Sequence, residues 1–331
     1  MVETTGPGRA KTIAAFAIVY VVWGSTYLAI LYAIRAIPPL LMAGARFAAA
    51  GVILYTVLRL RGAERPTRRN WMAAAVAGTG MLVMGNGAVT WAEQRVPSGV
   101  AALVVASVPL WMVILEWARP RGRLPSRGVL LGVLIGAAGL VFLVAPWNAG
   151  GGSIDRTAVG VVLVGAFCWA AGSLYTRTAP LPRNVLLGAA MEMLAAGAVL
   201  LAAGLVSGEG ARLRWSAIDA VAIASVAYLA VFGSVVAFSA YAWLLGNCPA
   251  TRVATYAYVN PVVAVLLGWW FADEALTART VGAMAVIVAG VVIVNTARAR
   301  PQPIDSAASP SPRAPVPTPS GRQRRRRTTR A

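Results

Sequence analysis

The 331-residue sequence contains no histidine and only two cysteines, Cys168 and Cys248. The lack of histidine excludes imidazole metal sites, histidine general bases and Ser-His-Asp triads together. Two cysteines, one in an apolar run and one in a short connection, offer no disulfide framework. Function must therefore rest on other side chains.

Charge is also scarce, because only 12% of the residues are charged whereas 58% are hydrophobic and the mean hydropathy is +0.69. Soluble domains carry roughly 25% charged residues. The few charges are gathered in short stretches between long apolar runs. This pattern excludes an ordinary soluble domain and indicates a membrane protein.

An apolar run of about 18 residues or more predicts a membrane span. Such runs occur at 12–34, 38–58, 71–92, 98–118, 128–146, 157–178, 184–206, 217–245, 250–271 and 275–297. Lipid cannot satisfy backbone polar groups, so the runs are predicted to be helices. We expect an all-α membrane protein with ten transmembrane helices. The first run is too long for a signal peptide, and the eighth is long enough to contain a kink near Gly233.

Basic residues predict the orientation of these spans. The loops on one side, with the first residues of the chain, carry 14 Lys and Arg, against six on the other side. Cytoplasmic loops carry the excess of basic residues. The sequence thus predicts a multi-pass inner (plasma) membrane protein with residues 1–11 and the C-terminus in the cytoplasm.

Residues 298–331 differ from the rest, because Pro, Ser and Ala precede an arginine-rich end and nine arginines lie from Arg298 onward. This composition predicts a disordered basic cytoplasmic tail. The tail either attracts anionic lipid headgroups or is a solvated segment that reinforces topology. No aromatic platform accompanies the arginines, so no nucleic-acid partner is expected.

Short motifs recur in order along the chain at offsets between 146 and 152 residues. The matched positions are Gly24-Ser25-Thr26-Tyr27 with Gly172-Ser173-Leu174-Tyr175, Ala49-Ala50-Gly51 with Ala195-Ala196-Gly197, Trp91 and Pro97 with Trp243 and Pro249, Pro109 with Pro261, and Gly139 with Gly290. They predict two repeats, 12–146 and 157–297. Because each has five spans, an odd number, the second enters the membrane from the opposite side, as in transporters with inverted repeats.

The residues that carry a family resemblance are Val22-Trp23-Gly24-Ser25-Thr26-Tyr27, Ala45-Arg46-Phe47, Val96 to Leu103, Pro109-Leu110-Trp111, Trp169 to Tyr175 and Tyr258 to Ala264. On these motifs the chain resembles the EamA branch of the drug/metabolite transporter superfamily. The resemblance implies a ten-helix carrier, often an exporter of amino acids or other metabolites. It also implies a central cavity lined by spans 1–4 and 6–9, with spans 5 and 10 as scaffold. The spacing of Gly128, Gly132 and Gly136 in span 5 fits close helix packing.

Two ionisable residues lie deep in apolar runs, Arg46 in span 2 and Glu192 in span 7, at repeat-equivalent positions. Charges inside a membrane usually face a cavity or a partner. We expect Arg46 to attract a carboxylate through its planar fork, and Glu192 to contact an amine or carry a proton. The alternatives are an ion pair that holds the two spans in register, or snorkelling to water.

Aromatic and polar residues on the expected cavity-lining spans predict a site for a small amphipathic substrate, since ligand sites combine apolar walls with a few polar groups. They are Trp23, Ser25, Tyr27, Trp91, Trp169, Ser173, Tyr175, Tyr241, Tyr256 and Asn260. The alternative for any one of them is a bond between helices or an interfacial position. Pro109 and Pro261 each remove a backbone hydrogen bond and act as gate hinges or as static bends.

A membrane-embedded enzyme or a structural membrane protein is the competing class. No metal-ligand cluster and no carboxylate pair beside a nucleophile occurs in the sequence, and Asp273-Glu274 reads as a solvated loop pair. The phosphate-binding G-x-x-x-x-G-K-[ST] pattern is absent, so no cofactor, metal or direct use of ATP is predicted. The expected partners are a small-molecule substrate and the lipid bilayer, and a secondary transporter is the preferred reading.

Overall fold

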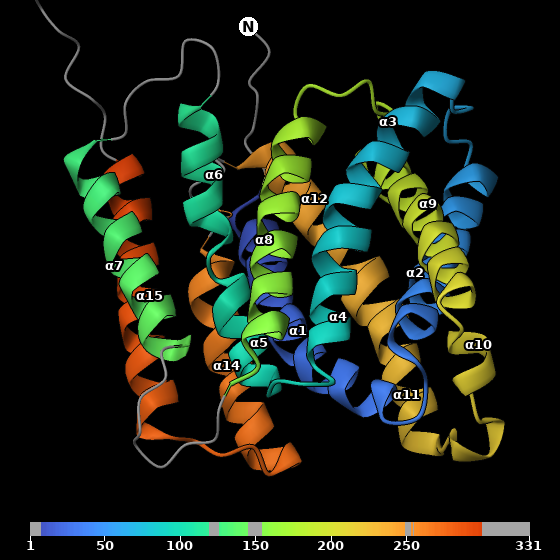
Figure 1. Ribbon diagram of the computed structural model, residues 1–331. Helices are drawn as coiled ribbons and strands as arrows, with labels where there is room; N and C mark the ends of the chain where they lie inside the picture. The colour runs from blue at the N-terminus through green and yellow to red at the C-terminus, as the bar shows by residue number, and fades with distance from the viewer. Residues whose placement is uncertain (1–7, 119–125, 145–153, 249–252, 254, 300–331) are drawn as a thin grey trace, which may run out of the picture. The chain divides into compact units, whose positions relative to one another are not determined.

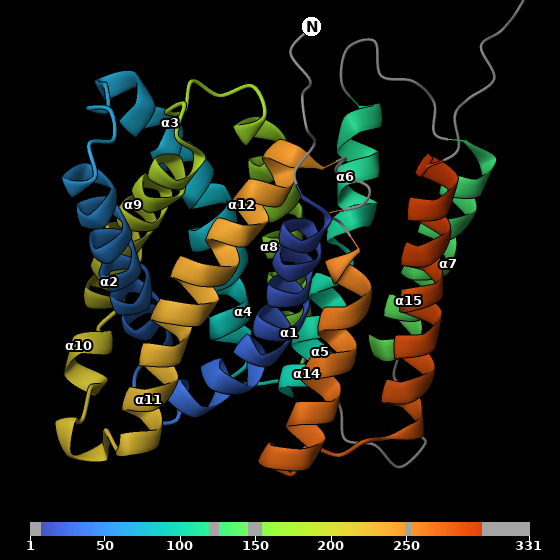
Figure 2. The same cartoon turned by 180° about the vertical axis from the view of Figure 1, so that it is seen from behind.

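The computed structural model describes residues 8–118, 126–144, 154–248, 253 and 255–299, and these residues form helices and connecting loops without a strand. The basic tail from Arg300 and the loop at 119–125 lie outside the described residues, so the predictions made for them stay predictions. Figures 1 and 2 show the long helices running side by side from one end of the bundle to the other.

Seven helices or helix series are long and apolar enough to cross a membrane. They are α1 (Arg9–Ile34), α2 (Pro39–Leu60), α3 (Arg68–Gly78) with η1 (Thr79–Asn86) and α4 (Gly87–Ala92), α5 (Ser98–Val105) with α6 (Val108–Trp117), α8 (Arg156–Thr176), α9 (Val185–Val206), and α11 (Ala220–Tyr228) with η3 (Leu229–Val236) and α12 (Ala237–Asn247). Three further apolar helices are α7 (Arg127–Val144), α14 (Tyr256–Ala272) and α15 (Ala278–Ala299). Short elements α10 (Glu209–Arg212) and η2 (Trp215–Ala217) follow α9.

The helices coincide with the predicted apolar runs, and the chain is a multi-pass all-helical membrane protein. We call the end of the bundle where α1 begins and α2 ends the basic face, because Arg59, Arg61 and Arg65 lie there. The other end is the opposite face. In Figure 1 the basic face is uppermost.

Helices α2 and α9 pack closely in antiparallel directions, and glycines set their register. A Cβ atom on Gly44 would lie 2.7 Å from the backbone N of Leu201, and one on Gly51 would lie 2.8 Å from that of Leu194. From the other side, a Cβ on Gly197 would lie 2.6 Å from the N of Ala48. Small residues let the two backbones approach, as is usual between membrane helices.

Each of these two helices begins beside a carboxylate that follows the other helix, although α9 also has its own cap, since Asn184 accepts from Leu186 N and Leu187 N. Glu209, just after α9, accepts hydrogen bonds from Leu40 N (3.3 Å) and Leu41 N (2.9 Å) at the start of α2. Glu64, just after α2, accepts one from Arg183 N (2.7 Å) just before α9. Negative groups stabilise helix N-termini, where backbone N–H groups lack partners. Glu64 and Glu209 stand at equivalent places in the two predicted repeats.

The same relation appears in two π-helical segments, η1 (Thr79–Asn86) and η3 (Leu229–Val236), which begin 150 residues apart. The kink predicted near Gly233 takes this form, since Gly233 lies within η3. Segments of π-helix are frequent at functional sites. Here both supply residues to the central cavity described below.

The two prolines predicted as hinges differ in their surroundings. The helix is interrupted at Ala106–Ser107, and Pro109 stands in the first turn of α6, where a missing N–H costs little. Pro261 instead lies inside the continuous helix α14. The paired kinks of the prediction are therefore unequal, with a break beside Pro109 only.

Helices α7 and α15 form a second antiparallel pair, seen along one edge in both views (Figures 1 and 2). A Cβ on Gly132 would lie 2.7 Å from Gly290 O, and one on Gly290 would lie 2.5 Å from Gly136 N. The glycine spacing in span 5 thus serves close packing, as the sequence predicts. Neither helix contributes a residue to the two cavities described next.

Candidate functional site

A cavity lies in the middle of the bundle, with about 710 Å³ of space between atoms, open space at its mouth included. Helices α1, α2, α8 and α14 and the π-helical segments η1 and η3 all contribute to it, so both halves of the chain form its wall. Its predicted lining residues are Trp23, Tyr27, Arg46, Trp169, Tyr256 and Asn260.

Arg46 is the one charged residue that lines this cavity, and its side chain is only 3% exposed. Its Nε donates to Ser234 Oγ at 2.9 Å, and its Nη1 donates to Asn86 Oδ1 at 3.4 Å. The guanidinium carbon also lies 4.7 Å from the centre of the Phe47 ring. Gly233 makes room for the guanidinium, because a Cβ there would lie 3.1 Å from Nη2.

No acidic side chain forms an ion pair with Arg46 within the described part of the chain. The ion pairs found there are Arg95–Asp155 and Arg177–Glu116, and neither involves Arg46. Both of its hydrogen-bond partners are neutral acceptors. A buried charge is costly unless it is paired, so an anion in the cavity would find an unpaired cation with unused N–H donors.

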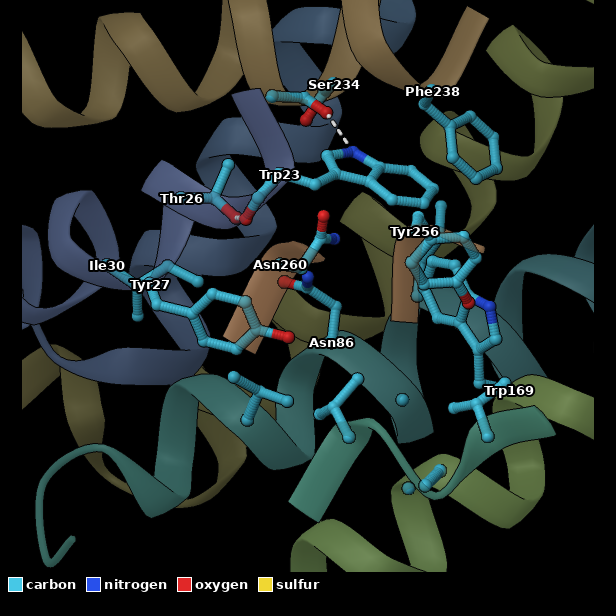
Figure 3. A pocket seen from close by; sticks show the side chains of 18 of the residues that line it. Trp23, Thr26, Tyr27, Ile30, Asn86, Trp169, Ser234, Phe238, Tyr256 and Asn260 are labelled. Carbon is cyan, nitrogen blue, oxygen red and sulfur yellow. Dashed lines mark hydrogen bonds between the residues drawn. The ribbon is translucent and has the colours of Figure 1, made fainter. Parts of the chain in front are cut away.

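Neutral polar groups face the same space from three helices. Figure 3 shows the hydroxyl of Tyr27 and the amides of Asn86 and Asn260 pointing toward one another. With its amide oriented so that nitrogen faces two carbonyls, Asn260 donates to the backbone O of Tyr20 and of Tyr256 at 3.2 Å. These groups provide hydrogen bonds, while the rest of the wall is largely apolar.

A cluster of aromatic rings closes the cavity toward the basic face. Trp23 has its ring centroid 4.9 Å from that of Tyr241, 5.5 Å from Tyr256 and 5.8 Å from Trp169. Trp23 is held in place because its Nε1 donates to Gly233 O at 3.1 Å. Phe238 joins the cluster, with its centroid 6.3 Å from that of Tyr241.

A second cavity lies beyond this cluster, nearer the basic face, with about 1040 Å³ of space that includes open space at its mouth. Glu192, Tyr241 and Arg177 line it, with residues from the end of α8 and the start of α9. Phe238 lines both cavities. The aromatic cluster therefore stands between two separate spaces, one with a buried arginine and the other with a buried glutamate.

Arg46 and Glu192 do not form the ion pair that was one of the predicted arrangements. In the register that places Ala48 beside Gly197, the two charges are about seven residues apart along the helix axes, roughly 10 Å. They lie in different cavities. The pair is separated by the register of α2 against α9, which is set by Gly44, Gly51 and Gly197.

Four other predicted residues line neither cavity. Ser25 shares a 2.6 Å hydrogen bond with Tyr228 Oη, and buried Ser173 contacts Met81 Sδ at 3.4 Å, so both connect helices. Trp91 lies under the guanidinium of Arg95 at 4.0 Å. Tyr175 packs against the core. Their roles follow the alternative reading, bonds between helices or interfacial packing.

Sequence reasoning missed Asn86, Ser234 and Phe238, which line the cavity, and Glu93, which is buried just after α4. Asn86 could have been predicted from the sequence, since an amide in the middle of an apolar run needs a hydrogen-bond partner. Ser234 lies beside Gly233, where only the kink was predicted. Glu93 falls at the predicted end of a span, where an acidic residue is expected to be solvated.

An all-helical membrane bundle with cavities among its helices is typical of polytopic membrane transporters, and the comparisons with known proteins support this class. The profile of the EamA-like transporter family matches residues 10–145 and 156–296. The chain belongs to this family, and the resemblance inferred from its motifs is confirmed.

Similar proteins support the class. The chain is 42% identical over 287 residues to a protein of Escherichia coli strain K12 named "Uncharacterized inner membrane transporter YedA", covering 86% of this chain and 90% of that protein. It is 27% identical over 289 residues to the "Probable amino-acid metabolite efflux pump" of Salmonella typhimurium, covering 83% and 92%. One solved structure, titled "Crystal structure of protein", shares the fold with a TM-score of 0.63 at 22% identity, over 88% of this chain and 99% of that one. The chain is thus an inner membrane transporter by family, and these relatives point to transport rather than to an enzyme.

Proposed function

We propose that this transporter carries small amphipathic metabolites that bear a carboxylate, with amino acids and related solutes as the first class to test. The observation that carries the proposal is Arg46, a buried cation in an aromatic cavity with no carboxylate partner among the described residues. A guanidinium binds carboxylates in bidentate fashion. The solute would complete a charge pair that the protein leaves open.

The walls favour an apolar side group on the solute. Trp23, Trp169, Tyr256 and Phe238 surround the cavity, and aromatic rings bind apolar and π-bearing groups. The hydroxyl of Tyr27, the amide nitrogen of Asn86 and the amide oxygen of Asn260 are left to orient polar atoms (Figure 3). A solute with one anionic end and one apolar end matches this division.

Transport would follow alternating access. The aromatic cluster separates the cavity of Arg46 from the cavity of Glu192, and inverted repeats exchange roles when a carrier turns from one side to the other. With the basic face in the cytoplasm, as the positive-inside rule predicts, Glu192 faces the cytoplasmic side. There it would meet the amine of an outgoing solute or take a proton.

Efflux is the direction we favour. The relative from Salmonella typhimurium is named an amino-acid metabolite efflux pump, and the cavity nearest the predicted cytoplasmic side carries an acidic residue suited to an ammonium group. An export cycle would pass the solute from Glu192 past the aromatic cluster to Arg46.

Counterflow of radiolabelled amino acids in proteoliposomes tests the proposal, with Arg46→Ala, Arg46→Lys and Glu192→Gln beside the wild type. We expect saturable counterflow that falls at least about tenfold in Arg46→Ala, because a lost charge pair costs 2 kcal/mol or more. Arg46→Lys retains the charge without the planar fork and should lie between. If counterflow by Arg46→Ala equals that of the wild type, the proposed role of Arg46 in binding the solute is wrong.

The competing readings are distinguished by the same preparation. An enzyme would consume its substrate in detergent, whereas a carrier requires a sealed membrane. If the Glu192→Gln variant transports normally at every pH, Glu192 is not a proton carrier.

A further inference from the structure

Glu93 is a buried carboxyl group outside the set that the proposed function uses. It follows the last residue of α4 at the opposite face and is only 3% exposed. Neither of its carboxylate oxygens has a hydrogen-bond partner. By contrast Glu64, Glu209 and Glu274 all accept bonds from backbone N–H groups. A buried acid without a single partner requires an explanation.

The ionisable groups that act on Glu93 come from three other elements. They are Arg46 on α2, Tyr27 on α1, and Glu274, which follows α14 and caps α5 through Ser98 N. The nearby Arg95 is already occupied, because it pairs with Asp155 at 3.8 Å and lies over the Trp91 ring. Arg46 is therefore the cation left to serve Glu93 in this part of the described structure.

Burial raises the pKa of Glu93 well above its usual range, and the neighbouring carboxylate of Glu274 raises it further. Arg46 opposes both effects but does not outweigh them. A carboxylate without hydrogen bonds in a desolvated place is unfavourable, so burial here favours the protonated form of Glu93 until a cation comes to it.

Helix geometry places Glu93 on the line along which Arg46 already reaches. Asn86, which accepts from Arg46, is followed at positions +3 and +7 by Val89 and Glu93, and such positions share one helix face. Glu93 is thus two turns farther toward the opposite face, where α2 also begins. The two charged groups already act on each other, and rotation about the flexible stem of Arg46 is the movement that would bring them together.

We propose that Glu93 is the internal counterion of Arg46. Glu93 holds a proton while Arg46 binds the anionic group of the solute. When that group leaves, Glu93 ionises and its carboxylate pairs with the guanidinium of Arg46. This rests on the proposed function, because it needs an anionic solute at Arg46. The proton released by the Glu93 carboxyl passes to water at the opposite face. The same site takes one proton back for each anionic group that binds.

The exchange keeps the site neutral in both states. In the loaded carrier the solute's negative charge balances Arg46 and Glu93 is uncharged, whereas in the empty carrier Glu93 and Arg46 balance each other. Because unpaired charge inside a membrane is costly, a neutral site lowers the barrier to conformational change in both directions. The solute therefore binds more tightly at the opposite face at lower pH.

Infrared difference spectroscopy of the solubilised carrier during a pH titration tests the counterion directly and needs no solute. We expect a carbonyl band from a protonated carboxyl that disappears in Glu93→Gln and persists in Glu64→Gln, the control at an exposed acid. A band from Glu192, also buried, is assigned separately with Glu192→Gln. Size-exclusion chromatography and circular dichroism establish that each variant is folded.

The decisive comparison is between the wild type and Arg46 variants. Removal of the cation in Arg46→Gln should shift the Glu93 titration to at least tenfold lower proton concentration, while Arg46→Lys should stay near the wild type. A Glu93 band that titrates identically in wild type, Arg46→Lys and Arg46→Gln overturns the counterion, and so does a Glu93→Gln spectrum that loses no protonated-carboxyl band.

Counterflow of the amino-acid panel adds the link to transport. Glu93→Gln should retain counterflow but lose its dependence on the pH at the opposite face, and an unchanged dependence contradicts the proposal. If no amino acid shows counterflow with the wild type, the proposed substrate class fails while the infrared titration still decides the counterion.

Discussion

The two closely packed helix pairs, α2–α9 and α7–α15, both pack through glycines, but only the first lines the cavities. Both are antiparallel, both join helices at equivalent places in the two predicted repeats, and in both a glycine Cβ would lie within 2.7 Å of a backbone atom of the partner. Yet α2–α9 carries the buried charges Arg46 and Glu192, whereas α7–α15 lines neither cavity. Close packing therefore does not tell which helices line the candidate site and which only support the bundle. The position of the buried charges does.

The largest expected effect comes from adding one methyl group to each pair. Gly290→Ala in α7–α15 and Gly197→Ala in α2–α9 should each lower the free energy of unfolding by about 1–3 kcal/mol, because neighbouring backbone cannot move aside. The measurement is the thermal midpoint of the detergent-solubilised protein by size-exclusion chromatography. Gly160→Ala is the matched control, since its Cβ would meet nothing within 4 Å.

Transport by the folded fraction sharpens this comparison. Gly290→Ala should retain counterflow per folded molecule, because α7–α15 lies outside the cavities, whereas Gly197→Ala should lose it as Arg46 and Glu192 shift. Equal loss in both variants would show that α7–α15 belongs to the working part of the carrier.

A smaller effect is expected at the reciprocal caps of the α2–α9 pair. Glu209→Gln should cost about 0.5–2 kcal/mol, the usual range for a lost helix cap, because Glu209 is 3% exposed and serves two N–H groups. Glu64→Gln should cost less, since Glu64 is exposed and solvent replaces its bond. Thermal midpoints at low and high salt give the comparison, and a larger loss for Glu64→Gln would contradict it.

The smallest effect is expected at the prolines, where the two halves of the molecule differ. Pro109→Ala should lower the turnover of counterflow by a factor of about two to five and leave the half-saturation concentration unchanged, if the helix break at Ala106–Ser107 is the predicted gate hinge. Pro261→Ala, within a continuous helix, should have less effect. Equal turnover in the two variants would indicate static bends.

Much of the site followed from the sequence, and the misses have a common cause. Arg46, Trp23, Tyr27, Trp169, Tyr256 and Asn260 were predicted and line one cavity. Ser25 and Ser173 have the same chemistry and the same expected spans, but they bond to other helices. Which way a side chain faces in a bundle that is apolar on all sides depends on neighbouring helices, and periodicity carries no such information.

The sequence by itself determined the membrane location, the helices and the duplication, because hydropathy, run length and repeated motifs are local properties of the chain. Only the tertiary structure decided that Arg46 and Glu192 lie in separate cavities with aromatic rings between them, and that Glu93 is buried. The physical reason is that the positions of these side chains depend on contacts between helices far apart in sequence. The register of α2 against α9, set by a few glycines, turns one pair of equivalent positions into two places on opposite sides of the molecule's centre.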